Sequence, residues 1–234
     1  MAVEKKTLTQ LSVPICLETL LYMLSGMVDT LMLSSVSDQA VGAVGTANTY
    51  IGVFIIMFGV ISSGMVAVMS QNIGAGRLGI AYQARQLGLI FNASIGIVMS
   101  VILAVFSGGI LRIVSIAPAL LAPAETYLKI VGGACFLNAL IPIFSSYLRV
   151  FGYTKHSLIG TIAGNVINII LNSIFLFVFK WGVMGVAVAT VISRVVNLII
   201  VAVMGAVLIK AKKNPERIST RKILAQIVKI GFQI

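Results

Sequence analysis

Two acidic residues lie inside the first long apolar segment of the sequence. Glu18 and Asp29 are separated by Tyr22 and Ser25, at intervals of four, three and four residues. At 100° per residue of a helix, this spacing puts all four side chains on one stripe, with the acids about 16 Å apart along the axis. An ionisable group inside a membrane-crossing helix costs several kcal/mol and is a functional candidate. Asp29 is the stronger candidate, because Glu18 is near the helix start, where interfacial water or the positive helix end can stabilise it.

Amides and hydroxyls recur with the same helical spacing further along the chain. The fifth apolar segment carries Thr161, Asn165, Asn168 and Asn172 on one stripe. We expect this face to look inward, because lipid does not satisfy such groups. Further members of the expected cavity come from the fourth and sixth segments: Asn138, Ser145, Arg149, Thr190, Arg194 and Asn197. The alternative for any single amide or hydroxyl is a packing contact between helices.

Arg194 is the one basic residue expected well inside a span, and its charge needs a partner. It either neutralises one of the two acids or extends toward an interface, and the sequence favours pairing. With one central arginine against two acids, the spans favour cationic compounds over anionic ones. We expect no enzyme chemistry and no metal centre, because the single histidine, His156, is in a basic loop and Cys16 and Cys135 are in apolar segments.

The composition indicates that the elements positioning these residues are membrane-spanning helices. The chain of 234 residues is 59% hydrophobic and only 10% charged, with a mean hydropathy of +1.09. A spanning helix needs about 20 mostly apolar residues, and six segments qualify. They are expected at residues 11–35, 43–70, 86–110, 126–148, 157–179 and 183–209. The fold class predicted is therefore an all-α membrane protein with six transmembrane helices.

Charge distribution predicts the orientation of these helices. Of the 17 basic residues, only Arg112, Lys129 and Lys180 fall in the loops of one side. The excess on the other side follows the positive-inside rule and predicts that both termini are cytoplasmic. The same rule explains the net charge of +11 without a nucleic-acid partner.

The chain is expected to contain one helical lobe followed by the start of another. Residues 1–222 form the predicted six-helix lobe, and no Ser-rich or acidic linker divides them. Residues 223–234 turn apolar after a basic segment, much as residues 8–15 do at the start. Transporters are often built from repeated halves, so residues 223–234 are predicted to be the start of a truncated second repeat.

Several segments, taken in order, resemble one transporter family. They are Pro14, Val28 to Thr30, the run Ser37 to Gly45, the turns Ser70 to Gly76 and Leu148 to Lys155, the span from Asn165 to Asn172, and the run Gly182 to Thr190. Together they are similar to the N-terminal half of a multidrug and toxin extrusion (MATE) transporter. The resemblance implies one lobe of a two-lobe, twelve-helix exporter.

This resemblance also implies a function and a set of site residues. Inward movement of Na⁺ or H⁺ would drive export of organic, cationic compounds across the plasma membrane, the inner membrane in a prokaryote. Asp29 corresponds to the family's cation-binding or proton-binding acid, and Asn168, Asn172 and Thr190 correspond to its neighbours. Asn172 stands where some members have a second carboxylate, so a two-acid proton site is in doubt. No cofactor is implied beyond the coupling ion, with at most a transient Na⁺ at Asp29.

Expected partners are a small organic substrate, membrane lipid, and either a second six-helix lobe or a dimer partner. Two other functions are compatible with the sequence. One is a flippase for lipid-linked oligosaccharides, which would need basic residues in the cavity to hold pyrophosphate. The other is a non-transporting, half-length membrane protein.

Overall fold

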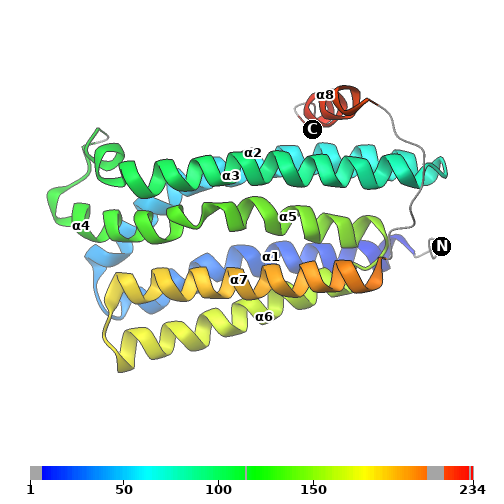
Figure 1. Cartoon of the computed structure of the whole chain (residues 1–234). Helices are drawn as coiled ribbons and strands as arrows, with labels where there is room; N and C mark the ends of the chain where they lie inside the picture. Colours follow the sequence, from blue (N-terminus) through cyan, green and yellow to red (C-terminus); the bar gives the residue numbers. More distant parts are fainter. Residues whose placement is uncertain (1–6, 114, 210–218, 232, 234) are drawn as a thin grey trace.

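The chain folds into a bundle of long helices. The computed structural model describes residues 7–113, 115–209, 219–231 and 233, and every regular element in this part is helical (Figure 1). The elements are α1 (Leu8–Ser34), α2 (Asp38–Gly74), α3 (Leu78–Ile113), α4 (Pro118–Tyr127), α5 (Cys135–Val150), α6 (Thr154–Ser173), α7 (Gly182–Leu208) and α8 (Thr220–Gly231). Two π-helical turns, Leu128–Gly132 and Ile174–Val178, follow α4 and α6. The all-α membrane fold predicted from composition is confirmed.

In the part of the chain that the structure describes, five helices are long and apolar enough to cross a membrane, and the pair formed by residues 118–132 and α5 makes a sixth span if taken as one. This pair is bent by 42° and contains the fourth span predicted at residues 126–148. The span begins earlier, at Pro118, which suits the first turn of a helix because proline lacks a backbone N–H. The bend follows Gly132 and Gly133, where two consecutive glycines weaken the helix.

Glycine closes the tight turns at one end of the bundle. Gly76 follows α2 with φ +76°, and Arg77 donates its N–H to the Asn72 carbonyl at 2.8 Å. Gly152 follows α5 with φ +86°, and Tyr153 donates in the same way to Leu148 at 2.8 Å. A residue without a Cβ is favoured at this left-handed position after a helix.

Buried polar side chains join α2, α3 and α5 to one another. Asn92 of α3 is fully buried and donates to the carbonyls of Phe58 in α2 and Ala139 in α5, at 3.3 and 3.1 Å. Ser62 of α2 lies 3.1 Å from Ser146 of α5, hydroxyl to hydroxyl. These contacts connect α5 to α2 and α3.

The last helix, α8, lies across α2 and α3 on the outside of the bundle (Figure 1). Its buried side is Ile223, Ile227 and Gly231. The contact is so close that a Cβ on Gly64 of α2 would be 1.9 Å from the Ile227 carbonyl oxygen. Residues 223–234, predicted as the start of a second repeat, fall largely within α8, although residues 232 and 234 lie outside the described part.

Candidate functional site

A cavity of about 500 Å³ is lined by α1, α2, α5, α6 and α7 and by Tyr127 at the end of α4. It exists because α1 packs mainly against α6, while α5 packs against α3 and α7. The polar stripes predicted from spacing converge there. The polar residues that line it are Glu18, Thr19, Tyr22, Ser25, Asp29, Asn48, Tyr127, Asn138, Ser145, Arg149, Thr161, Asn165, Thr190, Ser193, Arg194 and Asn197.

Asp29 is held by neutral groups from two neighbouring helices. Its side chain is buried, with 4% of the residue exposed. Oδ1 accepts a hydrogen bond from Asn172 Nδ2 of α6. Oδ2 lies 3.2 Å from the Thr190 hydroxyl of α7, whose proton is shared with the Val186 carbonyl at 2.8 Å. The predicted group of Asp29, Asn168, Asn172 and Thr190 is therefore assembled in space, and its role in binding a cation or proton stays a prediction.

The two asparagines beside Asp29 leave one acceptor and one donor unpaired. Asn172 Nδ2 also donates to Asn168 Oδ1 at 3.2 Å, but among the described residues neither the buried Asn172 Oδ1 nor the buried Asn168 Nδ2 has a hydrogen-bond partner. Within the described residues Asp29 forms no ion pair, so its charge is not neutralised by contact. Carboxylate, amide and hydroxyl oxygens gathered around one negative charge suit a hard monovalent cation or a proton. The described ranges contain no group of three His, Cys, Asp or Glu residues that could hold a metal ion of another kind.

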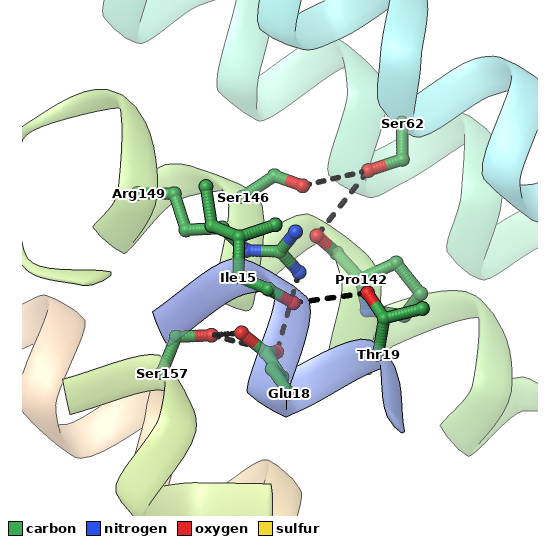
Figure 2. Close-up of polar contacts among 8 residues, drawn as sticks. All are labelled: Ile15, Glu18, Thr19, Ser62, Pro142, Ser146, Arg149 and Ser157. Atoms are coloured by element: carbon green, nitrogen blue, oxygen red, sulfur yellow. Dashed lines mark hydrogen bonds and ion pairs between the residues drawn. The ribbon is translucent and has the colours of Figure 1, made fainter. Parts of the chain in front are cut away.

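Glu18 has a different environment, at the other end of the α1 stripe (Figure 2). Its Oε1 accepts from Arg149 Nη2 of α5 at 3.2 Å. The Ser157 hydroxyl of α6 lies 2.8 and 2.9 Å from its two carboxylate oxygens. Glu18 is thus a satisfied, charge-compensated acid that joins three helices. This environment differs from the interfacial water or helix end considered for Glu18 from the sequence.

Arg194 does not form the predicted ion pair. Among the described residues, the ion pair in the cavity joins Glu18 to Arg149, and Arg194 acts on Asp29 only at longer range. The pairing expected from the sequence is wrong because Arg149, at the end of α5, is turned toward α1. The cavity therefore contains two acids and two arginines, and the expected excess of acids is also wrong.

The remaining predicted lining residues have mixed roles. Asn165 lines the cavity and also donates to the Leu21 carbonyl of α1 at 2.7 Å, which ties α6 to α1. Ser25 lines the cavity. Tyr22 lies at its open side, with 49% of the residue exposed.

Sequence reasoning missed four polar residues that line the cavity, Thr19, Asn48, Tyr127 and Ser193. Tyr127, at the end of α4, is 1% exposed and lies near Asn48 of α2 and Thr190. No spacing pattern marked Asn48 or Tyr127, because the residues three and four positions away from each, which share its helix face, are apolar or glycine. The presence of Tyr127 extends the polar surroundings of Asp29 to a fourth helix.

Comparison with known proteins matches this sequence and its fold to one family. The MatE family model matches residues 14–174. The uncharacterized transporter YisQ of Bacillus subtilis is 34% identical over 232 residues, which cover 97% of this chain and 51% of the relative. The probable multidrug resistance protein NorM of Thermotoga maritima is 31% identical over 209 residues, which cover 82% of this chain and 42% of the relative.

A solved structure shares the arrangement of helices. It is the outward-facing conformation of a multidrug resistance MATE family transporter of the MOP superfamily, with a TM-score of 0.86, 21% identity, and coverage of 96% of this chain and 50% of that one. The chain spans about half the length of the relatives it matches. Members of the family are transporters and not enzymes. The resemblance found in the sequence is confirmed, and the chain belongs to the MatE family.

Proposed function

We propose that this chain is the N-terminal lobe of an ion-coupled exporter of small organic compounds in the plasma membrane. The observation that carries the proposal is Asp29, a buried carboxylate that forms no ion pair with any described residue and is held by Asn172 and Thr190 beside a cavity large enough for an organic molecule. Binding cavities for such ligands measure about 300–1,000 Å³. An acid without an opposite charge in a membrane helix costs free energy of insertion, and a functional role explains why such a residue is present.

Coupling follows from the charge of this cluster. One Na⁺ or one H⁺ at Asp29 would neutralise the carboxylate, with Asn172 and Asn168 adding only neutral oxygens. Neutralisation weakens the charge-assisted hydrogen bonds of Asn172 and Thr190 to Asp29, so the contact of α1 with α6 and α7 depends on whether the ion is bound. A substrate carrying a positive group competes for the same carboxylate. Ion entry and substrate exit thereby become alternatives at one site, as antiport requires.

The orientation with both termini in the cytoplasm is part of this proposal, because the loop charges support it. A single lobe provides one wall of a transport pathway. We therefore propose that a second six-helix lobe, or a second copy of this chain, supplies the opposite wall. The exposed apolar side chains of α1, among them Met23, Met27 and Leu31, belong to the surface that such a partner or lipid would cover.

Binding of ²²Na⁺ to the purified chain tests the coupling site. We expect saturable binding that falls with decreasing pH, and at least a tenfold loss of affinity in Asp29→Asn, since the cluster then keeps no negative charge. Asp38→Asn is the matched control, because Asp38 is an exposed acid at the start of α2. If Asp29→Asn binds Na⁺ as the unmodified chain does, Asp29 is not the coupling site. If no Na⁺ binds, proton uptake on acidification, measured with the same variants, decides for or against Asp29.

A further inference from the structure

The outer side of α8 is positively charged. Arg221, Lys222 and Lys229 are all exposed, and α8 contains no acidic residue. At 100° per residue, these three side chains point away from the side of α8 that is buried against α2 and α3. Leu224 and Val228 are half-buried and lie on a flank between the two sides. An apolar flank beside a cationic face is typical of helices that lie in the interface of a membrane.

α8 crosses α2 at the depth where such an interface is expected (Figure 1). The two helices approach so closely at Gly64 and Gly231 that a Cβ on either glycine would meet the backbone of the other helix. Gly64 lies about 15 Å from the end of α2 at Gly74, at 1.5 Å per residue. α2 has 37 residues and is therefore about 55 Å long, whereas the hydrocarbon layer of a bilayer is about 30 Å thick. With this layer centred on α2, about 12 Å of the helix extends beyond each boundary, so α8 lies close to one boundary.

The end of the bundle nearest α8 carries further cations without matching acids. Arg77, in the turn before α3, and Lys155, at the start of α6, are both exposed. Within the described residues, neither they nor the three cations of α8 form an ion pair. Glu18 is the one described acid in this half of the bundle, and Arg149 compensates its charge at 3.2 Å. The cations on this side therefore have no anion of the described chain to bind.

We propose that α8 is a binding site for anionic phospholipid, with headgroup phosphates on Arg221, Lys222 and Lys229 and acyl chains against Leu224 and Val228. Phosphate oxygens accept charge-assisted hydrogen bonds from arginine and lysine. Each cation near an anionic membrane surface strengthens binding by about fivefold. A lipid also covers the apolar flank of α8, which a dissolved anion does not. This site is separate from the cavity, so the inference does not depend on the proposed export function.

Hydrogen exchange of residues 220–231 tests this site in the intact chain. The chain is compared in nanodiscs of phosphatidylcholine alone and in nanodiscs that also contain phosphatidylglycerol. Because opening of α8 releases the bound lipid, we expect exchange to be at least about tenfold slower with phosphatidylglycerol. High salt should remove the difference, since it screens exposed charges. The variant Arg221→Gln/Lys222→Gln/Lys229→Gln should show no slowing, and Lys229→Gln alone should reduce it by about fivefold.

The matched control is Arg112→Gln/Lys129→Gln/Lys180→Gln, which removes three exposed cations from the other end of the bundle and should keep the full slowing. Circular dichroism checks that both triple variants keep their helix content. Equal exchange in the two kinds of nanodisc overturns the inference, as does a slowing that persists without the α8 cations or disappears in the control. Glycerol 1-phosphate, added to the phosphatidylcholine nanodiscs, should have no effect. If it slows exchange as much as the lipid does, α8 binds a dissolved phosphate group and the lipid site is refuted.

Discussion

The ion pair between Glu18 and Arg149 predicts a large coupling energy between two helices that are far apart in the sequence. Glu18 lies in α1 and Arg149 at the end of α5, with 9% and 28% of their side chains exposed. Ser157 of α6 completes the contact (Figure 2). We expect Arg149→Met to destabilise the bundle strongly, because it leaves a buried carboxylate with one hydroxyl as its partner.

The magnitude follows from distance and burial. At an effective dielectric constant of about 20, unit charges 3.2 Å apart attract by roughly 5 kcal/mol. Desolvation of Glu18 offsets much of this, and water reaches Arg149. Removing one partner of a fully buried pair costs about 3–5 kcal/mol, so with Ser157 still bonded we expect about 2–3 kcal/mol for Arg149→Met. Glu18→Gln should cost about 1 kcal/mol, because the freed arginine can be hydrated.

A double-mutant cycle in mixed micelles measures the coupling directly. Reversible unfolding by SDS is followed by circular dichroism for the two single variants and for Glu18→Gln/Arg149→Met. We expect a coupling energy of about 1.5–2 kcal/mol.

The pair Glu125–Lys129 is the internal control. Its atoms are closer, at 2.7 Å, but its side chains are 27% and 52% exposed and four residues apart. Such pairs contribute about 0.3–0.5 kcal/mol. If the coupling energy of Glu18 and Arg149 is no larger than that of the control pair, burial does not strengthen this ion pair. Glu18 then does not stabilise the contact of α1 with α5 as the geometry indicates.

Two further predictions concern packing. Gly64→Ala should displace α8, because the added Cβ would be 1.9 Å from the Ile227 carbonyl oxygen. Hydrogen exchange of residues 220–231 should therefore accelerate in this variant. The control is Gly59→Ala, whose Cβ meets nothing within 4 Å and should leave the exchange rate unchanged. Equal protection in both variants would disprove the close contact. Asn92→Leu should lower the free energy of unfolding by about 1–2 kcal/mol, because two interhelical hydrogen bonds are lost. Unfolding by SDS measures this change in free energy. A stabilised variant would show that burying the unpartnered Oδ1 of Asn92 costs more than the two hydrogen bonds contribute.

Much of the fold could be read from local patterns. Each span is long and apolar because a bilayer has a fixed thickness and offers no hydrogen bonds to the backbone. The stripes of α1 and α6 followed from helical spacing, because side chains three or four residues apart share a face whatever surrounds them. The fourth span was less predictable, since its bend depends on how α4 and α5 pack against the other helices.

The contacts that side chains make between different helices could not be predicted from these local patterns. That Asp29 meets Asn172 and Thr190 came from resemblance to a family, and no spacing indicated it. That Glu18 pairs with Arg149, 131 positions away, and that Tyr127 reaches the same cavity, had no signal in the sequence.

The sequence by itself predicted about six spans, the polar stripes of α1 and α6 and the two acids buried in the first span, because these depend on properties local to one helix. Only the tertiary structure decided which acid is compensated and which is free. That outcome depends on the rotation of each helix about its axis and on side-chain reach across a gap. If α5 were rotated so that Arg149 pointed into solvent, Glu18 would lose its ion pair. Among the described residues it would then resemble Asp29, which has none.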